Sequence, residues 1–255
     1  MDILQGKKGL IVGIANDKSI AWGCAKAFQA AGADLAITYL NEKAEKYVRP
    51  LAEQVNASII MPLDVTDGSQ MEAVFETIDK QWGKLDFLLH AIAFAPKEDL
   101  HAKVSDCSRN GFLMAMDISC YSFIRMAHLA KPLMKDGGCM LTTTYYGGEK
   151  VVENYGVMGP VKAALEGTVK YMAAELGEKK IRVNALSPGA VATRAAGGIA
   201  HFDMLLEQAK QKSPEHELIG IDCVGAYARF LVSDEARLVT GSIAYVDAGF
   251  NIMGG

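Results

Sequence analysis

A tyrosine and a lysine that lie seven residues apart, Tyr155 and Lys162, have the side chains and the spacing for a catalytic pair. On a helix, seven residues at about 100° each bring two side chains to within about 20° of one another, two turns apart. A phenol can donate a hydrogen bond to a carbonyl oxygen that becomes an enolate, and an ammonium group can hold a ribose and favour nearby negative charge. Such a pair is also common by chance on a shared helix face, so its interpretation depends on the elements that position it.

A competing pair, Tyr146 and Lys150, has the four-residue spacing that most short-chain dehydrogenases use. That spacing needs a helix, which places the lysine beneath the phenol. The consecutive Gly147 and Gly148 disfavour a helix directly after a predicted strand. We therefore predict that this second pair is not catalytic.

Three loops upstream of the pair each follow a short apolar run. The first, residues 13–23, is a glycine turn of the kind that lets backbone N–H groups approach a pyrophosphate at a helix start, although its spacing does not match Gly-x-Gly-x-x-Gly. In it, Ser19 can donate its hydroxyl to a phosphate or serve as an ordinary helix N-cap. After later runs, Asp64 can accept from an adenine amino group beside Val65, and residues 90–93 are small enough for a ribose to lie near the backbone. Together these loops predict a dinucleotide site.

The residues after the second apolar run bear on the choice between NADH and NADPH. An NADPH site usually places an arginine or lysine there for the 2′-phosphate, whereas this sequence has the acidic Glu42, with Lys43 and Lys46 one turn away. We predict NADH, with NADPH as the alternative.

Short apolar runs alternate along the sequence with segments whose apolar residues recur at helical spacing. This alternation predicts which strands and helices position the loops. The predicted strands are residues 9–14, 33–40, 58–65, 85–93, 139–145, 181–186 and 242–246. The predicted helices include residues 20–32, a helix interrupted by Pro50, one capped by Asp67, and stretches over 112–129 and 155–176. This order predicts one α/β domain over residues 1–255, a Rossmann-like, doubly wound seven-stranded parallel sheet with helices on both faces.

Composition excludes several classes of protein. The 255 residues are 50% hydrophobic and 22% charged with a net charge of −4, and no basic tract suits nucleic acid. No apolar run approaches the roughly 18 residues of a membrane helix. Five scattered cysteines suggest reduced thiols, and the N-terminal segment does not have the form of a signal peptide, so we predict a cytoplasmic protein. No metal site is predicted.

With these residues placed, the sequence resembles the bacterial enoyl-acyl carrier protein reductases (NADH type) of the short-chain dehydrogenase/reductase superfamily, from Gly6 to about Gly249. The most specific part combines Gly13 and Ser19–Gly23 with Tyr145, Tyr155 and Lys162. The segments 64–65, 92–96 and 187–193 also fit.

The resemblance implies that NADH or NADPH delivers hydride to C3 of a trans-2-enoyl thioester linked to acyl carrier protein, in fatty acid biosynthesis, on a homotetramer. It implies that Tyr155 hydrogen-bonds the thioester oxygen, that Lys162 binds the nicotinamide ribose, that Tyr145 orients the substrate, and that Ala95 lies near the substrate. The remaining positions implied to contact the cofactor are Gly13, Ser19, Ile20, Asp64, Val65, Ile92, Val191, Ala192, Thr193, Arg194 and Ala195.

A long connection over about residues 190–221 is expected to act as a substrate-binding lid, because it begins with small residues and then carries apolar residues at helical spacing. A surface helix packed on the core is the alternative. Two positions depart from the family pattern, Ala93 where glycine is frequent and Leu40 where a polar residue often meets the ribose. They leave open the cofactor preference, the inhibitor sensitivity, and whether this is a second, divergent reductase.

Two other functions remain to be weighed. A short-chain carbonyl reductase or alcohol dehydrogenase would use a hydroxyl such as that of Thr142 or Thr143, and would want a lysine four residues after the tyrosine, where this sequence has Gly159. A non-catalytic dinucleotide sensor would have no need for Tyr155 and Lys162. Both residues therefore favour the enoyl reductase.

Overall fold

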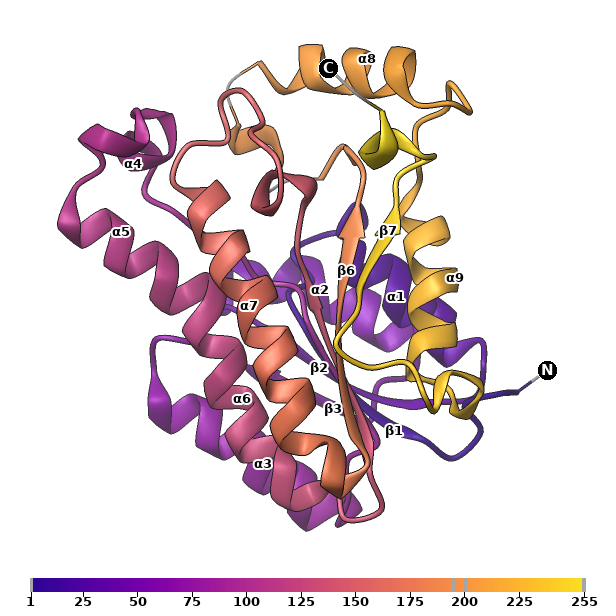
Figure 1. Cartoon of the computed structure of the whole chain (residues 1–255). Helices are drawn as coiled ribbons and strands as arrows, with labels where there is room; N and C mark the ends of the chain where they lie inside the picture. The colour runs from indigo at the N-terminus through magenta and orange to yellow at the C-terminus, as the bar shows by residue number, and fades with distance from the viewer. Residues whose placement is uncertain (1, 194–195, 200, 254–255) are drawn as a thin grey trace.

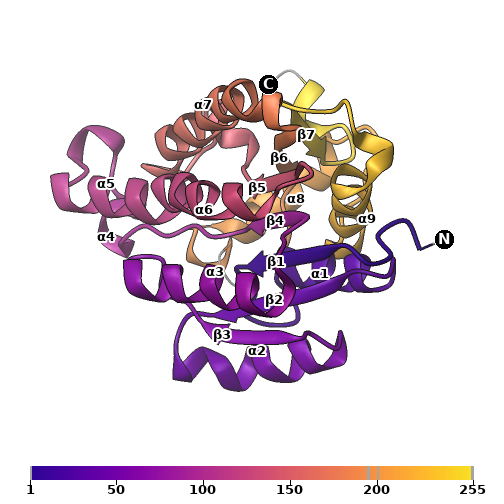
Figure 2. The same ribbon diagram turned by 90° about the horizontal axis from the view of Figure 1, so that it is seen from below.

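The computed structural model describes residues 2–193, 196–199 and 201–253. These residues form one seven-stranded sheet of order β3-β2-β1-β4-β5-β6-β7, in which every neighbouring pair is parallel (Figures 1 and 2). The strands are β1 (Lys8–Val12), β2 (Asp34–Tyr39), β3 (Ile59–Pro62), β4 (Phe87–His90), β5 (Gly138–Thr143), β6 (Ile181–Pro188) and β7 (Ile243–Val246). The predicted doubly wound parallel sheet is confirmed.

Helices cover both faces of the sheet, as predicted. The α-helices are α1 (Ile20–Gln29), α2 (Glu42–Gln54), α3 (Gly68–Trp82), α4 (Lys97–His101), α5 (Arg109–Met116), α6 (Ser122–Ala130), α7 (Met158–Leu176), α8 (Phe202–Lys212) and α9 (Ile221–Val232). Helices α1, α2 and α9 pack on one face, and α3, α6 and α7 pack on the other (Figure 2). Within the described part of the chain, no helix is both long and apolar enough to cross a membrane.

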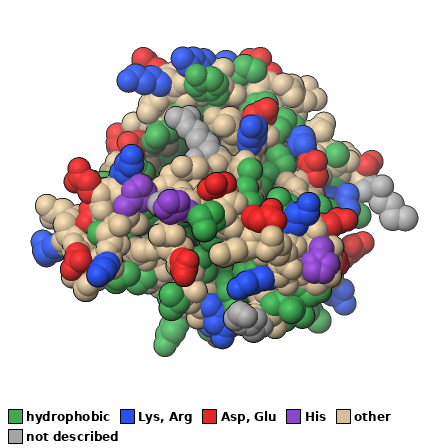
Figure 3. Space-filling view, turned by 90° about the horizontal axis from the view of Figure 1, so that it is seen from above, with side chains coloured by type: hydrophobic (Ala, Val, Ile, Leu, Met, Phe, Trp, Pro, Cys, Tyr) green, Lys and Arg blue, Asp and Glu red, His purple; other side chains and the backbone are tan. Residues whose placement is uncertain are grey.

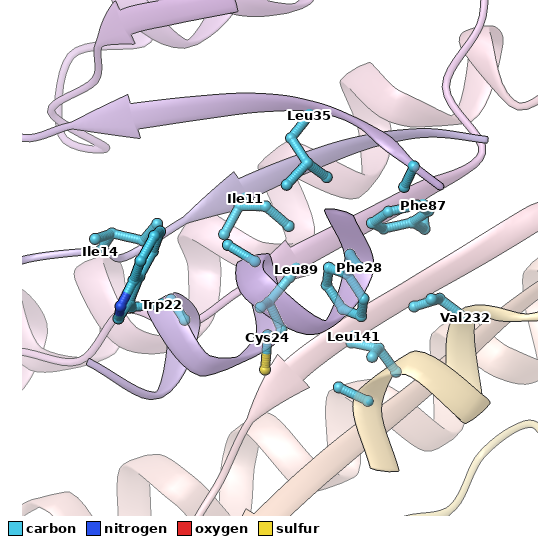
Figure 4. Close-up of a cluster of buried hydrophobic side chains, with 14 of the residues drawn as sticks. Ile11, Ile14, Trp22, Cys24, Phe28, Leu35, Phe87, Leu89, Leu141 and Val232 are labelled. Carbon is cyan, nitrogen blue, oxygen red and sulfur yellow. The ribbon is translucent and has the colours of Figure 1, made fainter. Parts of the chain in front are cut away.

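The core has two halves because successive side chains of a strand point to opposite faces. Leu10 of β1 belongs to the half under α3, α6 and α7, whereas Ile11 belongs to the half under α1, α2 and α9. In the second half, shown in Figure 4, the rings of Phe28 and Phe87 meet edge to face with centroids 4.9 Å apart. The apolar runs of the sequence are therefore buried on both sides.

Helices α1 and α9 touch through their backbones at Gly23 and Gly225. A Cβ atom at Gly225 would overlap the carbonyl oxygen of Gly23, and one at Gly23 would overlap that of Ile221. Glycine at both positions lets the two helices approach more closely than side chains would permit.

The start of α3 is the predicted cap, with one difference. Asp67 accepts hydrogen bonds from the backbone N–H groups of Ser69 and Gln70, which makes it the N-cap. The side chain of Gln70 accepts from the N–H of Asp64 at 2.9 Å rather than from Asp67. Gln70 thereby ties the end of the β3 loop to the helix.

The predicted interruption at Pro50 is wrong, because α2 runs unbroken from Glu42 to Gln54. Val48 and Leu51 are buried on either side of Pro50, whose own ring is exposed. Burial of the apolar face therefore outweighs the one main-chain hydrogen bond that a proline cannot donate.

Candidate active site

The strand order places a crevice at the carboxyl ends of β1 and β4. These strands are neighbours although the chain leaves β1 for β2 on the other side, which is the switch point where such sheets bind ligands. Two cavities of about 680 Å³ and 140 Å³ lie at this end. The residues that line both are Ile20, Ala93, Lys162 and Thr193, so the cavities adjoin. Figure 3 looks down on this end of the molecule, where hydrophobic surface lies among charged side chains of both signs.

Gly13 brings the β1 loop against the backbone of the β4 loop. Its φ of +116° lies in the region that favours glycine, and a Cβ atom there would overlap the carbonyl oxygen of Ala91. Strand β1 ends at Val12, before the predicted end, and Gly13, directly after it, lines the small cavity. A site where any side chain would fill the space fits a nucleotide that approaches the backbone closely.

Ser19 holds the same loop. Its buried Oγ accepts hydrogen bonds from the N–H groups of Ala15 and Asn16 at 3.0 and 3.1 Å, and it makes no side-chain cap on α1. Ser19 is the N-cap residue of α1 by position, as the alternative predicted, but its hydroxyl holds the loop before the helix and does not cap the helix itself. Ser19 also lines the small cavity.

The sequence-predicted cofactor residues divide into two sets. The residues that line the small cavity are Gly13, Ser19, Ile20, Ile92, Lys162 and Thr193, and Val191 lines the large one. Asp64, Val65 and Ala192 line neither cavity. One oxygen of Asp64 accepts from the N–H and the hydroxyl of Thr66 at 2.9 and 2.7 Å. Arg194 and Ala195 lie outside the described residues.

Tyr155 and Lys162 both line the large cavity, but they do not share a helix. Helix α7 begins at Met158, and Gly156 has a φ of +51°, which breaks the helical path between Tyr155 and α7. A Cβ atom at Gly156 would lie 2.5 Å from the carbonyl oxygen of Leu100, so the turn is packed tightly. The predicted helix over 155–176 is therefore wrong at its start, and the loop before α7 places the phenol.

The ring of Tyr155 is enclosed on two sides. Tyr145 meets it edge to face, with centroids 5.0 Å apart, and a Cβ atom at Gly147 would lie 2.5 Å from its Cδ1 atom. Burial raises the pKa of Tyr155 far above its ordinary value, and it raises the pKa of Tyr145 to about 12. Both phenols are therefore hydrogen-bond donors at neutral pH.

Lys162 is buried on α7, and its Nζ donates to the carbonyl oxygen of Thr143 at 2.7 Å. Burial lowers its pKa to about 8, while Glu166, one turn along the same helix, opposes that shift. The side chain is therefore mostly an ammonium ion at neutral pH, placed where both cavities meet.

The competing pair does not form a helical pair. Tyr146 lies in a single 3-10 turn, η4 (Tyr146–Gly148), and Lys150 is exposed beyond it, 3.5 Å from Glu149. The prediction that the two glycines prevent a helix here is confirmed.

Several residues near the site were missed by the sequence analysis. Thr144 lines the large cavity and donates to the buried carboxylate of Glu166 at 2.7 Å. Glu166 could have been noticed from its four-residue spacing from Lys162. His90, which was predicted together with residues 91–93 to lie near a ribose, is instead fully buried at the end of β4 and lines neither cavity.

Apolar side chains line much of the large cavity. Those contributed by the segments around α4, α7 and α8 include Leu100, Met158, Ile199 and Phe202. Ala95, predicted to lie near a substrate, lines the same cavity. His101 is joined to the carbonyl oxygen of Gly198 at 2.9 Å, so residues 97–101 and 196–198 meet. Among residues 2–193, 196–199 and 201–253, no three His, Cys, Asp or Glu side chains come together as a metal ion would require.

Comparison with known proteins gives matches along almost the whole chain. A family model described as enoyl-(acyl carrier protein) reductase matches residues 13–251. An enoyl-[acyl-carrier-protein] reductase [NADH] of Rhizobium meliloti is 47% identical, covering 98% of this chain and 93% of the relative. A reductase of the same name from Bacillus cereus is 44% identical, covering 100% of both chains.

Solved structures give the same result. The crystal structure of the enoyl-(acyl-carrier-protein) reductase of Anaplasma phagocytophilum in complex with NAD has a TM-score of 0.96 and 47% identity, over 99% of this chain and 97% of that one. The Bacillus cereus reductase, solved with NADP+ and indole naphthyridinone, has a TM-score of 0.97 and 44% identity over 100% of both chains.

Proposed function

The chain belongs to the enoyl-(acyl carrier protein) reductase family, and on that basis we propose that it reduces the C2–C3 double bond of trans-2-enoyl thioesters with NADH in fatty acid biosynthesis. The substrate is an enoyl group linked to acyl carrier protein. The observation that carries the proposal is a single cavity of about 680 Å³ that holds two phenols, a buried ammonium group and apolar side chains.

Tyr155 is the proposed donor to the substrate. Its hydroxyl donates a hydrogen bond to the thioester oxygen, and because its pKa is raised it stays protonated and cannot act as a base at neutral pH. NADH, when bound, would supply the hydride that adds to C3. The electron pair of the double bond would then move toward the thioester oxygen, and C2 would take up a proton from water. The phenol stabilises the negative charge that develops on that oxygen, and Tyr145 holds the thioester in position.

Lys162 is proposed to bind the cofactor and to stabilise negative charge on the substrate. It lies where the two cavities adjoin, so its ammonium group can hold the ribose next to the nicotinamide while it favours negative charge in the large cavity. The other residues that would hold NADH are Gly13, Ser19, Ile20, Ile92, Val191 and Thr193 around the cavities, with Asp64 and Val65 at the adenine end.

Residues 190–221 are the proposed lid over the acyl chain. Support comes from residues 196–199 and Phe202, which line the large cavity, and from the contact of Gly198 with His101. We refer below to the small-cavity residues and Asp64–Val65 as the nucleotide side, and to Leu100, Met158, Ile199 and Phe202 as the acyl side.

The decisive measurement is the oxidation of NADH and of NADPH, followed by absorbance, with crotonyl and longer trans-2-enoyl thioesters on carrier protein and on coenzyme A. We expect turnover with NADH and enoyl thioesters. Turnover of ketones or 3-oxoacyl thioesters alone would instead identify a carbonyl reductase, and tight cofactor binding without turnover would identify a sensor.

The proposal extends to a cytoplasmic homotetramer. Five large apolar side chains are exposed on α5, α6 and the turn between them, namely Phe112, Leu113, Met114, Tyr121 and Ile124, which suits a contact between copies of the chain. All five cysteines are unpaired, which suits a reducing compartment. Light scattering should give about four times 27.4 kDa, and Tyr121→Asp should lower that mass; fractionation of cells tests the location.

A further inference from the structure

The segment His90–Phe94 forms the wall between the two cavities. Residues 91–93 line the small cavity, and Ala93 and Phe94 line the large one. The segment leaves β4 at His90, and the N–H of Ala91 still donates to the carbonyl oxygen of Val12 in β1 at 2.9 Å. From Ile92 to Phe94, no strand pairing fixes the backbone. What holds this wall therefore affects both the nucleotide and the substrate.

Ser119 holds the far end of the segment. It is fully buried, its Oγ accepts a hydrogen bond from the N–H of Phe94 at 2.9 Å, and the same hydroxyl donates to the carbonyl oxygen of Phe94 at 3.2 Å. One side chain thus satisfies both main-chain groups of a loop residue, as a neighbouring strand would.

Ser122 holds the near end through the ring of His90. The Ser122 hydroxyl donates to the carbonyl oxygen of Ile118 at 2.6 Å, so toward His90 Nε2, 2.8 Å away, it accepts. His90 therefore carries its proton on Nε2, and its Nδ1 accepts from Thr142 at 2.9 Å. Burial lowers the pKa of His90 to about 3, which keeps the ring neutral in this bridge.

Ser119 lies in an unusual turn, and Ser122 is the first residue of the helix that follows it. The predicted helix over 112–129 is split into α5 and α6 by a π-helical turn, η2 (Asp117–Tyr121). The buried residues of this stretch include Gly111, Ala115, Ser119, Phe123 and Ala127, each four apart. In a regular α-helix a spacing of four drifts by about 40° per step, and a wider turn takes up that drift. The π-helical turn thus keeps Ser119 facing the segment.

We propose that Ser119 and Ser122 are positioning residues that clamp the two ends of His90–Phe94, and that the π-helical turn serves to present them. A hydroxyl that only satisfies its own helix behaves differently: Thr77 donates to Ala73, four residues back in α3. The clamp rests on the proposed function for its kinetic readout, whereas its effect on nucleotide binding does not require turnover.

The test compares Ser119→Ala and Ser122→Ala with the wild type, and with Thr77→Val as the matched loss of a helix hydroxyl. For each serine variant we expect the NADH dissociation constant and the KM for the enoyl thioester to rise roughly 3- to 10-fold, which is the loss of one net hydrogen bond. Hydrogen exchange over residues 91–95 should accelerate in Ser119→Ala, because the Phe94 amide loses its acceptor. Thr77→Val should leave all three quantities unchanged.

Unchanged dissociation constants in both serine variants, measured well below the thermal midpoint, would overturn the clamp even if that midpoint falls. If Ser119→Ala does not fold, Ser122→Ala decides alone, since it acts on the opposite end of the segment. Wild-type protein that binds NADH without reducing any enoyl thioester would defeat the proposed function but leave the comparison of dissociation constants valid.

Discussion

On the nucleotide side, Gly13 touches the backbone of Ala91 so closely that no side chain fits, and the hydroxyl of Ser19 ties the loop before α1. On the acyl side, helix α8 has Ala209 as its one buried residue, and Phe202 reaches the cavity from a half-exposed position. The first side is fixed by main-chain contacts, whereas the second includes side chains on the weakly buried helix α8.

The difference indicates how each side responds to change. Two backbones in contact cannot yield to an added atom, whereas a side chain on a weakly buried helix can be replaced with little loss of folding free energy. Substitutions on the nucleotide side should therefore either abolish NADH binding or leave it unchanged. Substitutions on the acyl side should alter the preference for enoyl thioesters of different chain length.

Gly13→Ala should produce the largest effect. The added methyl group overlaps the carbonyl oxygen of Ala91, and the φ of +116° is strained for alanine. We expect saturable NADH binding to disappear in a fluorescence titration. A variant that still binds NADH with the wild-type dissociation constant would show that the two sides do not differ in rigidity.

Tyr155→Phe should leave the nucleotide side intact. Loss of one hydrogen-bond donor to the thioester oxygen is expected to lower kcat by roughly 10- to 1,000-fold. The NADH dissociation constant should stay within about twofold of wild type. An unchanged kcat would remove Tyr155 from the proposed role.

The dependence on pH tests the residue at the junction of the two sides. Because the pKa of Lys162 is about 8, kcat/KM should fall about tenfold per pH unit above that value as the ammonium group loses its proton. Stability should respond with the opposite sign: the unfolded chain, with a lysine pKa of 10.5, binds more protons between the two values, so this residue's contribution to unfolding free energy rises there. Glu166→Gln should shift the fall in kcat/KM to lower pH, because the Glu166 charge raises the pKa of Lys162.

Phe202→Ala should give the smallest effect. We expect KM to rise about threefold to tenfold for long-chain enoyl thioesters, through loss of apolar contact, while crotonyl thioesters and NADH are unaffected. Met204→Ala is the control, since Met204 lies on the same helix but is exposed and does not line the cavity. Equal effects in both variants would count against the lid.

The fold was largely predictable because its strands are apolar runs buried on both faces. Each run maps to a strand, and alternation with helices determines the parallel order. The unbroken α2 could not be predicted, because the continuity of a helix through Pro50 depends on how Val48 and Leu51 pack against other elements. The sequence close to Pro50 carries no information about those contacts.

At the candidate site, the residues that line the cavities were easier to predict than the elements that hold them. Tyr155 and Lys162 were placed on one helix, yet a turn at Gly156 with positive φ positions the phenol, and its cause is the distant carbonyl of Leu100. Ser119 and Ser122 left one signal, two hydroxyls on an otherwise apolar helix face. Their partners at His90 and Phe94 become visible only once the strands are arranged.

The contact between Gly23 and Gly225 has a consequence for biosynthesis of the protein. Helix α1 follows the loop that holds Ser19, and it packs backbone to backbone on a helix about 200 residues further along. At about 5 to 20 residues per second, the ribosome delivers that partner roughly 10 to 40 s after α1 has emerged. Until then one flank of α1 is uncovered, so the nascent chain carries its nucleotide loop in an unfinished form and is exposed to chaperones and proteases during that interval.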